Sequence, residues 1–329
     1  MKNKAQPRWS RAIRLPLATI ALAALCAPAS ALNIVLTNDD GLSSNVKALY
    51  TALKGAGHDV VVSVPCQNQS GKGGSFNYLT PLVTLSKACR NNAAPAGAPA
   101  VGPISGLADF HYVDGTPVMA TLYGLDVLAP ARWGKVPDLV LSGPNEGPNT
   151  GSIVNGSGTV GNAQIAASRG LSAIAVSADA NTTGDDALAA EAAQLTLKLL
   201  AALQEKAGGS ALLPKGVALN VNFPKFSAGG AGGLPWSFAR HGTYESIALK
   251  FVSDLSQDPV AKSFGLGSSP YPGVSFNFNT AAPSSAQVED EGAVNAAGKI
   301  AVTAMQVGFE SRPATQQWLR LRLRKLLGQ

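Results

Sequence analysis

The chain has 329 residues and a formal net charge of +6, from 26 Lys and Arg and 20 Asp and Glu. Five basic and no acidic residues lie in positions 1–31, so the rest of the chain carries 21 basic and 20 acidic side chains and a net charge of +1. This near balance excludes charge as an argument for a nucleic-acid partner. The remaining length, about 300 residues, is enough for one large α/β domain with an appended extension.

Positions 1–31 have the pattern of an export signal peptide. A basic start is followed by an apolar run and by the small-residue sequence ASA at positions 29–31, which is typical of a cleavage site. The alternative is an uncleaved membrane anchor, but the run is short for a spanning helix and contains Pro28. Cys26 follows Leu25, whereas a lipid-attachment cysteine normally follows a small residue. We expect a periplasmic or secreted protein with no stable membrane span once the signal is removed.

Two cysteines remain beyond this signal, Cys66 and Cys89. Export places them in an oxidising compartment where thiols pair, so we expect a disulfide between them. Their spacing does not match a cysteine metal site.

The first elements along the chain are predicted to be a strand, a helix and a strand. Residues 34–37 are a short apolar run that is typical of a buried strand. Apolar residues then recur at the spacing of one helix face over residues 46–53, with Ser44 or Asn45 as the N-cap. Residues 59–64 form a second apolar run, so the chain opens with a βαβ unit and a parallel pair of strands.

Alternation of buried strands and amphipathic helices continues to residue 226. It predicts an α/β fold in which a mostly parallel sheet is covered on both faces, with the core spanning residues 32–226. Residues 90–108 are rich in Ala, Pro and Gly and are expected to form a surface loop or insertion. Residues 227–329 are expected to be a C-terminal extension. The other expected strands are 110–113, 138–141, 171–178, 217–224 and 299–305, and the other expected helices are 118–128, 160–168, 185–206 and 315–327.

Polar side chains follow three of the predicted strands, at the point where each strand ends. In a doubly wound sheet these carboxyl ends meet at one edge, where ligands bind. Carboxylate, hydroxyl and amide oxygens suit a hard divalent cation such as Mg²⁺, Mn²⁺ or Ca²⁺. The histidines at positions 58, 111 and 241 show no spacing typical of zinc ligands. The strand-end residues are Asn38, Asp39 and Asp40, then Asn68 and Ser70, and then Ser142, Asn145 and Asn149.

The adjacent carboxylates of Asp39 and Asp40 need an explanation. Two such groups a few ångströms apart repel by about 1 kcal/mol in water and by several times more in a partly dry site. Without a cation, one of them tends to take up a proton. A divalent cation removes this penalty, and the alternative is that one aspartate caps the following helix or turn.

A second signal is the sequence GSGTVGN, in which Ser157 and Thr159 precede a predicted helix. The N–H groups and the dipole at a helix start attract anions, although an ordinary N-cap explains the same pattern. Residues 70–75, SGKGGS, lack the spacing of a P-loop. A hard cation beside an anion-binding helix start describes a phosphoryl site, because both groups neutralise negative charge on the phosphate.

These motifs together resemble the SurE family of metal-dependent survival-protein nucleotidases and phosphatases. The resemblance implies a Rossmann-like three-layer core and the hydrolysis of nucleoside 5′- and 3′-monophosphates. It also implies Mg²⁺ or Mn²⁺ as cofactor, with Ca²⁺ as a possible crystal substitute, and homodimers or homotetramers that exchange their C-terminal extensions. The matching stretches, in the family's order, are IVLTNDDG, QNQSGKGGS, VDGTPV, DLVLSGPNEGPNTG, SGTVGNA, ALNVNFP and GKIAVTAM.

The resemblance also assigns residues. Asp39 and Asp40 are the implied catalytic residues, and the implied metal ligands are Asp39, Asp40, Ser70 and Asn145. Phosphate or substrate contacts are expected at Asn38, Asn145, Ser157, Gly158 and Thr159. The sequence departs from the family where the usual Asp-Arg pair is replaced by Cys66 and Gln67, and a disulfide at Cys66 is expected to tether the base of the Ser70 loop in its place.

The sequence leaves two other functions open. One is a broad-specificity exported acid phosphatase on the same fold, without a preference for nucleosides. The other is a non-enzymatic periplasmic protein that binds a metal ion or a nucleotide.

Overall fold

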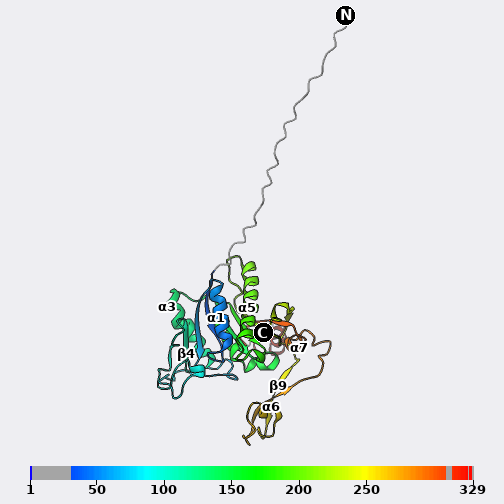
Figure 1. Cartoon of the computed structure of the whole chain (residues 1–329). Helices are drawn as coiled ribbons and strands as arrows, with labels where there is room; N and C mark the ends of the chain where they lie inside the picture. Colours follow the sequence, from blue (N-terminus) through cyan, green and yellow to red (C-terminus); the bar gives the residue numbers. More distant parts are fainter. Residues whose placement is uncertain (2–30, 309–312, 325, 328–329) are drawn as a thin grey trace.

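The computed structural model describes Met1 and residues 31–308, 313–324 and 326–327, so the expected export signal lies almost wholly outside the described residues. A nine-stranded sheet forms the centre of the protein, in the order β3-β4-β2-β1-β5-β6-β7-β11-β8 (Figure 1). Its strands are β1 (Asn33–Thr37), β2 (Asp59–Pro65), β3 (Val101–Pro103), β4 (Phe110–Val113), β5 (Leu139–Glu146), β6 (Ala173–Ala178), β7 (Val217–Asn222), β8 (Trp236–Ala239) and β11 (Ile300–Gln306).

The sheet is mostly parallel, as the alternating pattern predicts. Strand β1 pairs in parallel with β2 on one side and with β5 on the other, and β4, β6 and β7 continue the parallel arrangement. The antiparallel pairs are β3 with β4 and β11 with β7. The α/β fold expected from the sequence is therefore confirmed.

Helices cover both faces of the sheet. Helices α1 (Ser44–Gly55) and α5 (Asp186–Ala207) lie side by side over one face (Figure 1). Helices α2 (Pro117–Tyr123), α3 (Ala129–Trp133) and α4 (Gly158–Ser168) belong to the other side, where α3 and α4 contribute to a second apolar cluster. Strand β1 shows why two layers form, because Ile34 and Leu36 point into the first core and Val35 into the second.

Three local expectations are corrected. The N-cap of α1 is Ser43, whose hydroxyl accepts a hydrogen bond from the Val46 N–H, and it is neither Ser44 nor Asn45. Strand β5 runs on to Glu146, so the polar sequence SGPNE lies within the strand. Residues 90–108 are more than a surface loop, because they contain the short helix η1 (Arg90–Asn92) and the edge strand β3.

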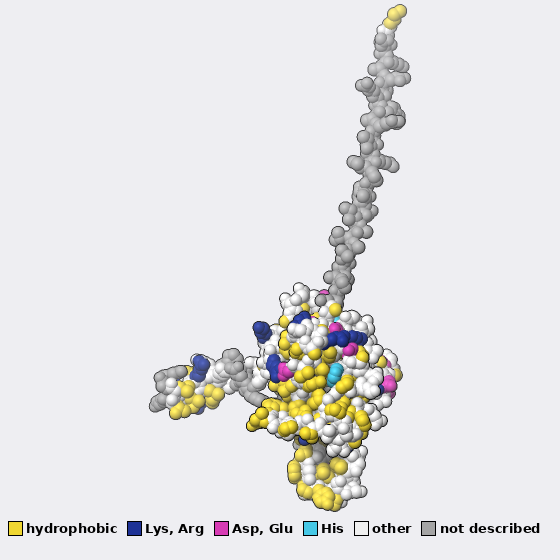
Figure 2. All heavy atoms as spheres, turned by 90° about the vertical axis from the view of Figure 1, so that its left-hand side faces the viewer, with side chains coloured by type: hydrophobic (Ala, Val, Ile, Leu, Met, Phe, Trp, Pro, Cys, Tyr) yellow, Lys and Arg dark blue, Asp and Glu magenta, His cyan; other side chains and the backbone are white. Residues whose placement is uncertain are grey.

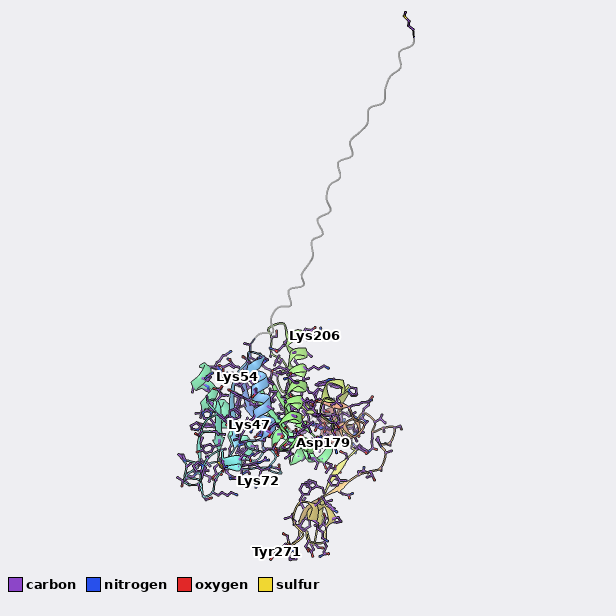
Figure 3. The ribbon with its side chains drawn as sticks, viewed as in Figure 1. Lys47, Lys54, Lys72, Asp179, Lys206 and Tyr271 are labelled. Atoms are coloured by element: carbon purple, nitrogen blue, oxygen red, sulfur yellow. A yellow bond between two sulfur atoms is a disulfide. The ribbon has the colours of Figure 1, made fainter. Side chains whose placement is uncertain are left out.

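Residues 227–306 contribute to the same sheet and also form an arm. Strands β8 and β11 complete one edge of the sheet, with α7 (Glu291–Ala296) packed against β11. Strands β9 (Ile247–Val252) and β10 (Gly273–Phe278) pair with each other and, with α6 (Pro259–Ser263), project from the core (Figure 1). Yellow apolar side chains are prominent on the projecting part below the core in Figure 2, and Tyr271 lies at its tip in Figure 3.

The described part of the chain ends in helix α8 (Pro313–Leu323). Within the described residues, no helix combines the length and apolar character required to cross a membrane.

Candidate functional site

The predicted site residues gather where the chain reverses the direction in which it builds the sheet. From β1 the chain adds β2 and β4 on one side and then returns to add β5, β6 and β7 on the other. Asp39 and Asp40 follow β1, and Asn145 lies near the end of its neighbour β5. Ligands bind at such a switch point in open α/β sheets because the loops diverge there and leave room. Figure 3 shows Lys72 and Asp179 toward this end of the core and Lys54 and Lys206 toward the opposite end.

Asp39 is buried against the start of helix α4. Its Oδ1 accepts a 2.6 Å hydrogen bond from the Thr159 hydroxyl, and the side chain is only 2% exposed. Burial raises the pKa of Asp39 from its ordinary value, and hydrogen bonds from the Thr159 hydroxyl and from the backbone of Gly158 and Thr159 oppose that rise. A Cβ at Gly158 would lie 2.6 Å from the Asp39 Cβ, so glycine is what lets the helix approach this closely.

Asp40 lies between β5 and the loop after β2. Its Oδ2 accepts a hydrogen bond of 3.1 Å from the Glu146 N–H, and its Oδ1 has a long contact of 3.4 Å with the amide of Asn68. The pKa of Asp40 is raised well above its ordinary value by burial and by the negative charges of Asp39 and Glu146. The Glu146 N–H and the positive charge of Arg90 oppose the rise.

Asn145 brings an oxygen to the same place. The register between β5 and β6 shifts between Ser142 and Asn145, which is a bulge that redirects the strand end. Its side-chain nitrogen donates to the Gly147 carbonyl at 2.7 Å, while its Oδ1 is buried without a hydrogen-bond partner among the described residues. Several buried asparagine oxygens of the described residues share this property, and the Asn145 oxygen is the one that lies next to Glu146, whose N–H bonds to Asp40, so it is free to bind a cation beside the two carboxylates. Gly143 makes the bulge possible, because a Cβ there would lie 2.1 Å from the Val176 carbonyl oxygen.

This donor set fits a hard divalent cation. Two buried carboxylates and one unpaired amide oxygen are the ligand types that Mg²⁺ and Mn²⁺ prefer. Among the residues that the structure describes, no three His, Cys, Asp or Glu side chains form a metal-binding group by themselves. A cation held by Asp39 and Asp40 would therefore need further oxygens from amides, hydroxyls or water, and the ligand roles expected for Ser70 and Asn145 stay predictions.

Ser70 lies in an exposed segment that is attached to Asp39. The N–H of its neighbour Gln69 donates to the Asp39 carbonyl at 2.8 Å, and the Ser70 N–H donates to the Asn68 side chain at 2.9 Å. The structure thus brings the Ser70 segment to the site. The role of the Ser70 hydroxyl as a metal ligand stays a prediction.

Three other strand-end or helix-start residues hold the structure together. The Asn38 amide bonds with Gly41 through both its oxygen and its nitrogen, which closes the turn that carries the aspartates. The Ser157 hydroxyl accepts from the Val160 N–H, so the ordinary N-cap reading is confirmed. Asn149 is buried and bonded to Ser177 and Asn222. Contact of Asn38, Ser157, Gly158 or Thr159 with phosphate stays a prediction.

The sequence motifs do not identify three residues that contact the site, namely Arg90, Asn162 and Glu146. Arg90 donates to the Asp40 carbonyl at 2.7 Å and to the Glu146 carboxylate at 2.8 Å. Asn162 donates to the Asn38 carbonyl and the Ser142 hydroxyl, which fixes α4 to the ends of β1 and β5. Glu146 is visible in the strand-end sequence, but Arg90 lies in a stretch that has no motif of its own.

The sequence is similar to proteins of one known family. The sequence model of the family described as "Survival protein SurE" matches residues 34–245. An acid phosphatase of Yarrowia lipolytica is 39% identical over 204 residues, which cover 58% of this chain and 56% of that protein. A 5′-nucleotidase SurE of Desulfatibacillum aliphaticivorans is 36% identical over 193 residues, which cover 59% of this chain and 66% of that protein. The match therefore spans less than two thirds of each of these two relatives.

A solved structure shows the same fold. The crystal structure of the SurE protein from Aquifex aeolicus superposes with a TM-score of 0.63 at 24% identity, and the match covers 90% of this chain and all of that one. The family match covers more than half of the chain and includes both aspartates, Ser70 and Asn145. The chain belongs to the SurE family.

Proposed function

We propose that this protein is a divalent-metal-dependent phosphomonoesterase that hydrolyses nucleoside 5′- and 3′-monophosphates. The observation that carries the proposal is the burial of Asp39 and Asp40 together at the switch point, beside the unpaired oxygen of Asn145. Two acids and an unpaired amide oxygen are unfavourable in a dry site unless a cation neutralises them. The names of the relatives, 5′-nucleotidase and acid phosphatase, support a phosphate ester as substrate.

Asp39, Asp40, Asn145 and Ser70 are the residues that would hold the cation. Bound there, it supplies positive charge that polarises the phosphate oxygens. In hydrolysis a water oxygen forms a bond to phosphorus, the ester P–O bond breaks, and a proton passes from the water to the leaving alcohol. We propose that Asp39 or Asp40, both buried at this site, orients this water or accepts its proton. Thr159 and Gly158 hold Asp39 in place for that role.

The choice between nucleotidase and general phosphatase is tested with substrates. The chain from residue 32 is assayed on AMP, GMP and a simple aryl phosphate, each with Mg²⁺, Mn²⁺ and Ca²⁺. A higher kcat/KM on the nucleotides supports the nucleotidase. A preference for the aryl phosphate supports the second candidate, a broad acid phosphatase, which the 39% identity to a protein of that name favours.

The third candidate, a non-enzymatic binding protein, gives a different result in the same assay. It binds metal or nucleotide but releases no phosphate from any of the three substrates. The presence of both aspartates together with Asn145 in one site argues against it.

We also propose that the arm built from β9 and β10 joins two copies of this chain. It exposes a set of large apolar side chains, which is unusual for a surface that stays in water. Light scattering of the purified chain, with and without residues 247–278, tests the assembly, and a monomer for the full chain contradicts it. The large apolar residues exposed on the arm are Leu249, Phe251, Phe264, Leu266, Tyr271, Val274 and Phe278.

The proposed location is the periplasm or the exterior of the cell. The disulfide between Cys66 and Cys89, which the structure contains, supports it because such bonds persist in oxidising compartments. Fractionation of expressing cells tests it, and recovery of the uncleaved chain in the cytoplasm contradicts it.

A further inference from the structure

Arg90 lies beside the candidate site, although no sequence motif includes it. Its guanidinium donates through one nitrogen to the backbone carbonyl of Asp40 and through another to the carboxylate of Glu146. Glu146 in turn donates its backbone N–H to the Asp40 side chain. Asp40 is thus held at two points, at its backbone by Arg90 and at its carboxylate by Glu146, and Arg90 joins these two supports.

The neighbouring residue strengthens the same connection. The Asn91 side chain donates to the Leu42 carbonyl at 2.7 Å. Arg90 and Asn91 therefore both bind backbone carbonyls of the turn that carries the aspartates. The short helix η1 therefore holds this turn through hydrogen bonds, although Arg90 is 50 residues away from Asp40 along the chain.

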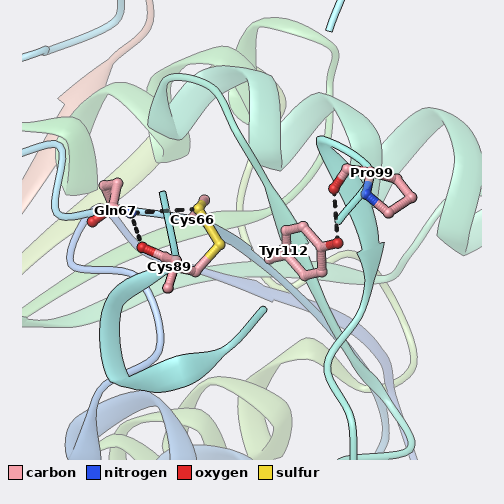
Figure 4. The surroundings of a disulfide bond; sticks show 6 residues. Cys66, Gln67, Cys89, Pro99 and Tyr112 are labelled. Atoms are coloured by element: carbon pink, nitrogen blue, oxygen red, sulfur yellow. Dashed lines mark hydrogen bonds between the residues drawn. A yellow bond between two sulfur atoms is a disulfide. The ribbon is translucent and has the colours of Figure 1, made fainter. Parts of the chain in front are cut away.

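A disulfide attaches helix η1 to the end of strand β2. Cys66 lies at the end of β2, and its bond to Cys89 fixes the residue directly before Arg90 (Figure 4). The Arg90 N–H also donates to the Cys66 carbonyl at 2.8 Å. The Gln67 side chain donates to the Ala88 carbonyl at 2.7 Å, so three links join the two segments within a few residues.

The intervening chain offers little other support. Every residue from 74 to 84 is exposed, so this stretch makes few contacts that could guide residue 89 to the site. Buried packing resumes with Leu85, Ala93 and Ala94. Cys66 and Cys89 are buried in the same cluster, so the disulfide fixes the chain directly before Arg90, beyond the exposed stretch.

We infer that Arg90 is a positioning residue for the metal site and that the Cys66–Cys89 disulfide is the tether that keeps it there. This inference rests on the phosphomonoesterase function proposed above and names a part of its site. Arginine fits this positioning role because its planar guanidinium group can donate to two acceptors at once, whereas lysine has a single ammonium group on a flexible side chain. It holds the turn that carries Asp40, and it does not have to touch the substrate.

The test separates geometry from charge with four proteins. Arg90→Lys keeps the positive charge but loses the planar guanidinium group. The double variant C66S/C89S keeps all charges but loses the disulfide. The third protein combines these three substitutions, and the fourth, Arg169→Lys, is the control. Among the interactions found in the described part of the chain, the Arg169 side chain forms an exposed ion pair with Asp126 and none with Asp39, Asp40 or Glu146. Far-UV circular dichroism and Tm confirm that each protein is folded.

The primary measurement is the dissociation constant for Mn²⁺, titrated on each metal-stripped protein. Loss of a residue that supports metal ligands typically weakens metal binding about 10- to 100-fold, and we expect this for Arg90→Lys and for C66S/C89S. Adding Arg90→Lys to C66S/C89S should change the constant by less than about 2-fold, because both act through one contact. Arg169→Lys should match the wild type. The kcat on AMP should fall in parallel, with a smaller change in KM.

Several results overturn the inference. The first is an Arg90→Lys variant that binds Mn²⁺ as tightly as the wild type. The second is a combined variant whose loss of Mn²⁺ affinity equals the product of the losses in Arg90→Lys and C66S/C89S. The third is a wild type that does not bind Mn²⁺. If C66S/C89S does not fold, Arg90→Lys and the double variant C66A/C89A, whose methyl groups suit the apolar surroundings of the two buried sulfurs, decide the matter by the same titration. If the wild type binds Mn²⁺ with the expected pattern but releases no phosphate from AMP, the proposed function fails while the positioning role stands.

Discussion

The Thr159 hydroxyl donates a hydrogen bond of 2.6 Å to the carboxylate of Asp39, which ties the first turn of α4 to the end of β1. Both side chains are buried. The start of α4 thus receives an anion from the protein itself, in the form of Asp39. The helix dipole and the hydroxyl together favour the ionised carboxylate that a cation requires.

Thr159→Val should weaken the site while preserving its shape. The variant loses a hydrogen bond to a charged group, which typically contributes about 1.5–3 kcal/mol, so we expect Mn²⁺ affinity and kcat to fall about 10-fold or more. Thr159→Ser keeps the hydroxyl and should stay close to the wild type. Metal titration and AMP hydrolysis check the pair, and equal loss in both variants would show that the methyl group, and not the hydroxyl, matters.

Gly158→Ala should destabilise the protein. The added Cβ would meet the Asp39 Cβ and the Pro117 Cγ at 2.6 Å, and overpacking of this kind costs about 1–3 kcal/mol. Gly156→Ala is the matched control, because a Cβ there has only ordinary contacts, the nearest at 3.8 Å. Urea unfolding of both variants measures the difference. A loss at position 156 as large as that at 158 contradicts the close approach of α4 to Asp39.

Asp40→Asn should stabilise the metal-free protein at neutral pH. The pKa of Asp40 is higher in the folded than in the unfolded chain, so the folded state binds this proton more tightly. The stability of the metal-free protein therefore falls as pH rises from the ordinary aspartate value through the raised one. The neutral amide removes that loss, and Tm at pH 7 in a chelator should rise by a few degrees. A lower Tm than that of the wild type would show that the Asp40 charge does not destabilise the metal-free fold.

Added metal should reverse this pH dependence in the wild type. Protons compete with the cation for Asp39 and Asp40, because burial raises the pKa of both carboxyls. The increase in Tm on adding Mn²⁺ should therefore be larger at pH 8 than at pH 5. Thermal scans at the two pH values, with and without Mn²⁺, measure it. An increase that is independent of pH places the cation somewhere other than on these two carboxyls.

The sequence predicts much of the core because local patterns govern it. The apolar run of residues 34–37, the helical spacing over 46–53 and the polar strand ends each depend on neighbours in the chain. These patterns correctly predict the parallel sheet and bring Asp39, Asp40 and Asn145 to one edge. The disulfide, which is expected from two cysteines and the predicted export signal, is present in the structure.

Long-range contacts account for what the sequence does not predict. Arg90 reaches Asp40 across 50 positions, and no local pattern distinguishes it from other residues of an Ala- and Pro-rich stretch. The polar start of α4 predicts an anion, but only the fold shows that Asp39 occupies this position. Likewise, the asparagine at position 149 looks like a ligand in sequence and becomes a buried connector once β6 and β7 are in place.

The most direct test of the proposed activity compares the wild type with Asp39→Asn. Both proteins, expressed from residue 32, are stripped with a chelator, supplied with Mn²⁺ and assayed for phosphate release from AMP. Mn²⁺ should restore the wild-type rate and leave Asp39→Asn at the rate of the buffer blank, with circular dichroism showing that both are folded. Equal rates for the two proteins with Mn²⁺ would contradict the account of Asp39 as the centre of a metal-dependent phosphomonoesterase site.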